Sequence, residues 1–134
     1  MQPIAAKLQS PSTDGASIVA IVDDDPAVCG SLKFSLELEG FGVRAYGSAP
    51  EFLNAGDLAA CDCFVIDQRM PAMNGMELIA KLRDLKIQTP AILLISHPNP
   101  ALSARAAIAG VPVVEKPLLS DTLVDKIREA CARN

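Results

Sequence analysis

The stretch Ile18-Val19-Ala20-Ile21-Val22-Asp23-Asp24-Asp25 decides the fold. Its five successive apolar residues are typical of a strand that is covered on both faces, as in a parallel sheet. The three acidic residues end that strand, and Asp25 followed by Pro26 is the cap and first-turn pair of a helix. A buried strand that passes through a polar turn into a helix predicts the opening unit of an α/β domain.

The alternation of strand and helix repeats along the chain. Apolar runs predict strands at Ile18–Val22, Val43–Tyr46, Cys63–Ile66, Ala91–Ile95 and Val111–Val114. The second run alternates and the fifth contains Pro112, so both suit the edges of a sheet. The strand order 2-1-3-4-5 follows, in a flavodoxin-like, doubly wound (βα)5 parallel sheet of class α/β. We therefore expect one domain over residues 18–132, with residues 1–17 as a flexible N-terminal extension.

Local signals also predict where helices begin, end and pack. Asn99–Pro100 repeats the start signal, and Ser120 is expected to cap the last helix. Glycines at 40 and 110 predict two helix ends. Leu78, Ile79 and Leu82 mark a buried helix face, as do Leu123 and Ile127. Phe34 and Leu38 lie off the main apolar stripe of their helix, so they are either a partner-facing patch or part of a wide buried face.

Composition narrows the classes of protein that the chain can represent. Its 134 residues carry 12 Lys and Arg against 16 Asp and Glu, a net charge of −4, and no basic stripe predicts direct nucleic-acid binding. No apolar run approaches the ~20 residues of a membrane span, and the first residues lack a signal peptide. We therefore expect a cytoplasmic protein without membrane contact. The four cysteines lack zinc-binding spacing and are expected to be reduced thiols in or near the core.

Charged side chains follow several of the predicted strands. Asp23 and Asp24 end the first strand, Asp67 ends the third, and Lys116 follows the fifth. Parallel strands end at one edge of the sheet, so these groups should converge there. Clustered carboxylates repel one another, and Mg²⁺ is the usual ion that relieves the repulsion. A carboxylate beside Mg²⁺ and a lysine can act as a nucleophile toward a phosphoryl group, whereas a turn of three aspartates would repel a bound nucleotide.

Several motifs then give a family resemblance. The first strand with its acidic turn, Val65-Ile66-Asp67-Gln68-Arg69-Met70-Pro71, Asn74-Gly75 and Glu115-Lys116-Pro117 resemble the receiver domain of bacterial two-component response regulators. The D-x-R-M-P version resembles receivers of the nitrogen-fixation-regulator type. The resemblance implies a phosphoprotein that serves in signalling and transcription regulation rather than an enzyme, although it assists its own phosphorylation and dephosphorylation. A sensor histidine kinase and an output domain or downstream protein are the implied partners, and homodimerisation stays open.

The resemblance also implies roles for individual residues. Asp67 would accept the phosphoryl group. Asp24, Asp67 and the backbone carbonyl of Arg69 would hold Mg²⁺, with Asp23 acting through a metal-bound water. Lys116 would contact the phosphoryl oxygens, and the Lys116–Pro117 bond is a candidate for the cis form. His97 is the only histidine; because a lone histidine has no metal-binding partner, a loop role is favoured, and it is named with Gln68 only as a modulator of phosphorylation.

Two positions depart from the receiver pattern. Receivers usually place Thr or Ser at the end of the fourth strand, where this chain has Ile95. Either Ser96, one residue later, contacts the phosphoryl group or no hydroxyl does, because a one-residue shift turns a strand side chain to the opposite face. Val113 stands where receivers usually have Phe or Tyr. The fourth helix, Ala101–Ala109, is rich in alanine and is expected to be loosely anchored.

These departures leave two alternatives beside the phosphoacceptor. The first is a pseudo-receiver, a protein-binding module of the same fold whose switch residues Ile95 and Val113 are altered. The second is a Mg²⁺-dependent phosphatase that acts through an aspartyl phosphate. It would need an acid two residues after its nucleophile, and Arg69 occupies that position.

Overall fold

A five-stranded parallel sheet forms the centre of the molecule. The computed structural model describes residues 16–116 and 121–132. The strand order is β2-β1-β3-β4-β5, which confirms the predicted order. The strands are β1 (Ile18–Val22), β2 (Gly42–Tyr46), β3 (Cys63–Asp67), β4 (Ala91–Ile95) and β5 (Val113–Glu115). The three strands predicted to be interior, β1, β3 and β4, are almost wholly buried.

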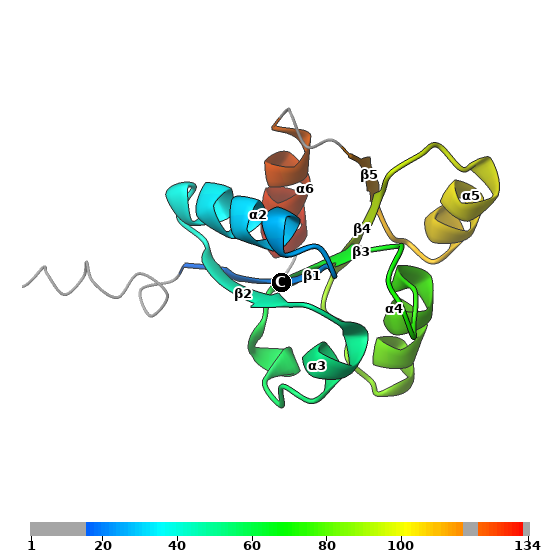
Figure 1. Cartoon of the computed structure of the whole chain (residues 1–134), viewed down its shortest axis with the longest axis horizontal. Helices are drawn as coiled ribbons and strands as arrows, with labels where there is room; N and C mark the ends of the chain where they lie inside the picture. Colours follow the sequence, from blue (N-terminus) through cyan, green and yellow to red (C-terminus); the bar gives the residue numbers. More distant parts are fainter. Residues whose placement is uncertain (1–15, 117–120, 133–134) are drawn as a thin grey trace, which may run out of the picture.

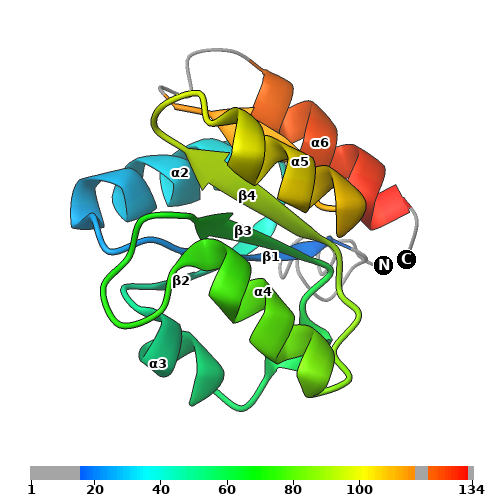
Figure 2. The ribbon, with the colours of Figure 1, turned by 90° about the vertical axis from the view of Figure 1, so that its right-hand side faces the viewer.

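Helices cover both faces of this sheet (Figures 1 and 2). They are α2 (Pro26–Leu38), α3 (Ala49–Leu53), α4 (Gly75–Asp84), α5 (Pro100–Ile108) and α6 (Thr122–Ala132), with a 3₁₀ turn at Leu58–Ala60. Side chains of α2 and α6 pack on one face, and those of α3, α4 and α5 pack on the other. The result is the doubly wound architecture that the sequence predicts. In residues 16–116 and 121–132, no helix is both long and apolar enough to cross a membrane.

The predicted capping residues fix where the helices begin and end. The side chain of Asp25 accepts a hydrogen bond from the amide of Ala27 at the start of α2, and Asn99 accepts one from Leu102 at the start of α5. Gly40 and Gly110 follow the ends of these helices with φ of 98° and 74°, a backbone conformation that favours glycine. Ser120 and the predicted N-terminal extension, apart from its last two residues, lie outside the described residues.

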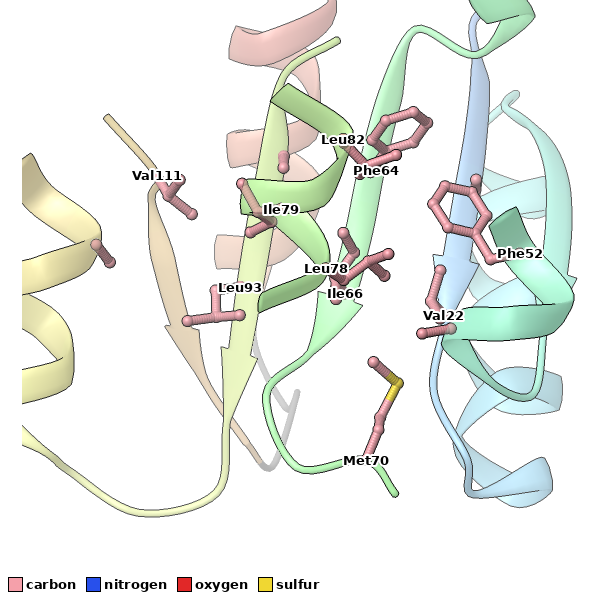
Figure 3. Close-up of a cluster of buried hydrophobic side chains, with 14 of the residues drawn as sticks. Val22, Phe52, Phe64, Ile66, Met70, Leu78, Ile79, Leu82, Leu93 and Val111 are labelled. Carbon is pink, nitrogen blue, oxygen red and sulfur yellow. The ribbon is translucent and has the colours of Figure 1, made fainter. Parts of the chain in front are cut away.

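The core is mainly aliphatic and holds three buried phenylalanines, Phe41, Phe52 and Phe64. Figure 3 shows the cluster beneath α3 and α4, where Phe52 and Phe64 meet edge to face with ring centroids 5.1 Å apart. Alternate residues of each strand point to opposite faces, so Ile66 and Leu93 join this cluster while Val65 and Leu94 pack toward α2 and α6. Burial of each large side chain contributes about 1.5–3 kcal/mol. This packing fixes the strand ends that carry the charged residues.

The structure also tests the predicted bounds of the fifth strand, the two alternatives for Phe34 and Leu38, and the burial of the fourth predicted helix. The fifth strand begins at Val113 rather than Val111, because Pro112 has no amide hydrogen for the ladder, and it extends to Glu115. Phe34 and Leu38 are 66% and 73% exposed, so the buried-face alternative for this pair is wrong. Helix α5 begins at Pro100 and buries only Leu102 and Ala106, whereas its loose anchoring stays a prediction.

Candidate phosphoacceptor site

Three aspartates converge at the carboxyl edge of β1 and β3. Asp23 and Asp24 follow β1 directly, and Asp67 is the last residue of β3. One carboxylate oxygen from each lies within 4.8 Å of the others. Asp23 and Asp67 are 1% and 4% exposed, whereas Asp24 is exposed to solvent. The predicted acidic cluster is therefore present, with one side open to water.

In the turn after β1, Asp23 and Asp25 have different structural roles. The amide of Asp23 donates to the carbonyl of Tyr46 at 3.1 Å, which extends the β1–β2 pairing by one residue. Its Oδ1 accepts from the amide of Asp25 at 2.9 Å. Asp25 is occupied as the cap of α2, as predicted, and so it stands apart from the cluster. The half-buried Cys29 thiol also lies 3.2 Å from the carbonyl of Asp23, a contact that no sequence signal indicated.

Lys116 connects the fifth strand to the two buried aspartates. Its Nζ lies 2.9 Å from Oδ1 of Asp67 and 3.1 Å from Oδ2 of Asp23. Its amide donates to the carbonyl of Ile95 at 2.7 Å, which fixes the backbone from which the side chain reaches across the sheet edge. Among the residues that the structure describes, Lys116 is therefore the only cationic side chain that pairs with the cluster. Pro117 lies outside the described residues, so the cis form of the Lys116–Pro117 bond stays a prediction.

The charges of the site are only partly balanced. Burial raises the pKa of Asp67 above 3.8, and the neighbouring Asp23 and Asp24 add to that rise against the hydrogen bond from Lys116. Burial alone would lower the pKa of Lys116, but its hydrogen bonds to Asp67 and Asp23 outweigh this effect and raise the pKa. One ammonium group therefore does not fully compensate three carboxylates, and a further cation would be stabilised here.

The donor set suits a hard divalent cation. Among the described residues, the cluster brings together carboxylate oxygens of Asp23, Asp24 and Asp67 alone, and the exposed side at Asp24 leaves room for water. Mg²⁺ prefers oxygen ligands, takes one or two carboxylates and keeps several waters. The cysteines do not compete: all four are free thiols, and burial raises the pKa of Cys63, which disfavours the metal-binding thiolate.

Gln68 holds the loop that follows Asp67. Its amide donates to the carbonyl of Leu94, its carbonyl accepts from Gly75, and its side-chain oxygen accepts from the amide of Met76 at 3.0 Å. A Cβ at Gly75 would lie 2.8 Å from the backbone oxygen of Asp67, so only glycine allows this close approach. Arg69 is exposed on the same loop, and the structure leaves its predicted metal-binding role untested.

The start of α4 adds a feature that sequence reasoning missed. Asn74 and Glu77 form a capping box, in which each side chain accepts a hydrogen bond from the other's backbone amide at 2.9 Å. The N-x-x-E spacing is a known signal of such a start and could have identified it. Together with Gln68, this box fixes the loop between the phosphoacceptor candidate and α4.

The residues that depart from the receiver pattern lie in β4 and β5 and in the loop after β4. Ile95 is 5% exposed and packs in the core on the side of α4 and α5. Ser96 is exposed and borders, with Lys116, a groove between α2 and α6. His97 is exposed in the following loop, and Val113 is a half-buried residue packed against the core. In β4 itself no residue carries a hydroxyl group.

Comparison with known proteins identifies the family. Residues 19–128 match the response regulator receiver domain family. The chain is 35% identical over 119 residues to the response regulator protein TodT of Pseudomonas putida, covering 88% of this chain and 52% of TodT. It is 38% identical over 113 residues to the transcriptional regulatory protein FixJ of Rhizobium meliloti, covering 84% of this chain and 55% of FixJ.

Solved structures agree with this assignment. The structure of FixJ-N superposes with a TM-score of 0.75 at 36% identity, covering 88% of this chain and 94% of that one. The chain spans about half the length of the curated relatives it matches. Receivers are signalling domains rather than classical enzymes, and the FixJ match agrees with the predicted subtype. The chain belongs to the response regulator receiver domain family.

Proposed function

We propose that this receiver domain, residues 18–132, accepts a phosphoryl group on Asp67 from a sensor histidine kinase in a Mg²⁺-dependent reaction. The observation that carries the proposal is the position of Asp67. Its carboxylate is buried at the sheet edge, 2.9 Å from Lys116 and beside two further aspartates. That arrangement places a nucleophile next to groups that can compensate the charge of a phosphoryl group.

Each residue has a separate task in this reaction. An oxygen of Asp67 attacks phosphorus, the bond to the donor's leaving group breaks, and an acyl phosphate remains on Asp67. Lys116, already within 3.1 Å of both buried aspartates, contacts the transferred oxygens. Asp24, Asp67 and the carbonyl of Arg69 would hold Mg²⁺, with Asp23 acting through a water. The bound ion supplies positive charge that offsets the charge of the phosphoryl oxygens.

The phosphorylated domain would then control an output domain or a downstream protein. TodT is a response regulator and FixJ a transcriptional regulatory protein, and both are about twice as long as the matched region. Transcription regulation through such a partner is the corresponding proposal for this chain, and a homodimer is one form that the activated domain can take. Gln68 and His97 flank the site from two loops and would modulate the lifetime of the acyl phosphate.

A pseudo-receiver is the second candidate function. The observation that favours it is the absence of both usual switch side chains: Ile95 is buried in the core, and Val113 has no aromatic ring to turn inward. In that case the domain binds a partner without a phosphorylation-dependent change. The intact set of Asp24, Asp67 and Lys116 opposes this candidate, because such a module has no need of them.

Incubation with acetyl phosphate separates the two candidates. We expect intact-protein mass spectrometry to show one added phosphoryl group in the presence of Mg²⁺ and none after chelation. Asp67→Asn should abolish the adduct, whereas Asp84→Asn, which removes an exposed carboxylate of α4, should leave it unchanged. No adduct with any small phosphodonor or divalent metal would favour the pseudo-receiver.

The role of Ser96 needs a second comparison. The lifetime of the adduct in Ser96→Ala is measured against that of the unaltered protein. A changed lifetime assigns the phosphoryl contact to the Ser96 hydroxyl. An unchanged lifetime shows that no hydroxyl group at the end of β4 takes part.

A further inference from the structure

A second hollow lies beside the aspartate cluster, between the β3–α4 loop and the first turns of α5. Its volume is about 390 Å³. Met70, Ala101 and Leu102 contribute apolar surface to it. Its polar lining comes from two arginines and three carboxamides: Gln68, Arg69, Asn74, Asn99 and Arg105. None of the described residues that line it carries a carboxylate, although the chain has a net charge of −4.

The guanidinium groups of these two arginines have no partner among the residues that the structure describes. Five arginines lie in the described part of the chain. Arg44 contacts Asp57, Arg83 donates to the carbonyls of Ile87 and Thr89, and Arg128 pairs with Glu39. Within residues 16–116 and 121–132, the guanidinium groups of Arg69 and Arg105 make no hydrogen bond and no ion pair. Both unpaired arginines border this hollow.

The three carboxamides also present donors rather than acceptors. The side-chain oxygen of Gln68 accepts from the amide of Met76, that of Asn74 from Glu77, and that of Asn99 from Leu102. Because each partner is a backbone N–H, the oxygen must face it, which settles the orientation of each amide group. Each side-chain NH₂ group is then left to donate elsewhere. The polar side chains of the hollow therefore offer N–H donors and positive charge.

From these contacts we propose that the hollow binds a small ligand with an anionic oxygen group, a phosphate or a dicarboxylate. Guanidinium groups bind such oxygens through two parallel hydrogen bonds, and the carboxamide donors can satisfy the remaining lone pairs. The volume suits a ligand of a few heavy atoms over the apolar floor. Gln68 directly follows Asp67 and Asn99 follows β4, so the ligand would contact two segments that leave the phosphoacceptor edge. Binding itself does not depend on phosphorylation of Asp67.

Titration of the metal-free protein tests the proposal. Inorganic phosphate and succinate are added separately at constant ionic strength, and the side-chain NH₂ signals of Gln68, Asn74 and Asn99 are followed by NMR. We expect saturable shifts of these signals with at least one of the two anions; the anion that produces them identifies the ligand class. The absence of saturable shifts with both, or shifts spread over surface lysines instead, would overturn the proposal.

Matched variants locate the site. The side chain of Arg105 is exposed and makes no hydrogen bond or ion pair within the described fold, so Arg105→Gln should fold normally. It should weaken binding about tenfold, the usual effect of losing a charge-assisted hydrogen bond. Arg105→Lys keeps the positive charge and should weaken binding less than Arg105→Gln does. Lys81→Gln removes an exposed positive charge on α4, outside the hollow, and should leave the affinity within about twofold. Equal weakening by Arg105→Gln and Lys81→Gln would show binding to net charge alone and refute the site.

Discussion

Replacing Lys116 with methionine tests how the site holds its buried charges. Methionine keeps much of the length of the side chain but removes the ammonium group that lies 2.9 Å from Asp67 and 3.1 Å from Asp23. The side chains of both aspartates are almost fully buried, so the two carboxylates would be left with little compensation from water. Loss of one partner from a buried ion pair costs about 3–5 kcal/mol. Because the Lys116 side chain is itself 19% exposed, we expect Lys116→Met to lower the free energy of unfolding by about 2–4 kcal/mol.

Urea denaturation followed by far-ultraviolet circular dichroism measures this loss in metal-free buffer at neutral pH. The control is Lys33→Met, which breaks an ion pair with Glu37 whose side chains are 46% exposed and should cost less than about 0.5 kcal/mol. An unfolding free energy of Lys116→Met within about 0.5 kcal/mol of the unaltered protein would refute the electrostatic reasoning.

The pH dependence of the same variant has a definite sign. The pKa of Lys116 is raised above 10.5, so its stabilising contribution is complete below that pH and is lost as the pH rises through the folded-state value. The unaltered protein should therefore lose stability in this alkaline range, and Lys116→Met should not show that loss. Mg²⁺ should restore part of the variant's stability at neutral pH, since a bound cation replaces the missing charge.

Three further predictions concern stability. Asp67→Asn should stabilise the metal-free protein at neutral pH, because burial and the neighbouring Asp23 and Asp24 disfavour the charge of Asp67 more than Lys116 favours it, which raises its pKa. Urea titrations should show this difference shrinking as the pH falls toward 3.8, and a less stable Asp67→Asn at neutral pH would contradict the reasoning. Gly75→Ala should lower the thermal midpoint, because the added Cβ would lie 2.8 Å from the backbone oxygen of Asp67. Gly30→Ala is the control: its Cβ would meet nothing within 4 Å on α2, and the higher helix propensity of alanine, about 1 kcal/mol, should raise the midpoint. Phe34→Ala and Leu38→Ala should change the unfolding free energy by less than about 0.5 kcal/mol because both side chains are exposed, and a larger loss would show that they pack against the fold.

Much of the fold could be predicted because local signals and global topology agree. The apolar runs located all five strands, and alternation in β2 with Pro112 near β5 identified the two edges. Those edges determined the strand order, and the order brought Asp23, Asp67 and Lys116 to one side of the sheet. The start of β5 was misplaced because an apolar run does not show which of its residues pair with β4.

Other features depend on side-chain packing, which the sequence pattern does not contain. The exposure of Phe34 and Leu38 depends on whether another part of the chain packs against that side of α2, which the sequence pattern does not show, so both alternatives stayed open. Gln68 was named only as a modulator, yet its side chain holds the loop against α4. The hollow between Arg69 and Arg105 could not be predicted, because it forms only where two loops from different strands meet.

The most direct test of the central claim is the chemical location of the acyl phosphate. The protein is phosphorylated with acetyl phosphate and Mg²⁺, reduced with borohydride to convert the modified aspartate to homoserine, and sequenced by peptide mass spectrometry. The proposed mechanism predicts homoserine at position 67 alone, and none when Mg²⁺ is chelated. Modification at Asp23 or Asp24 with Asp67 unchanged would contradict it.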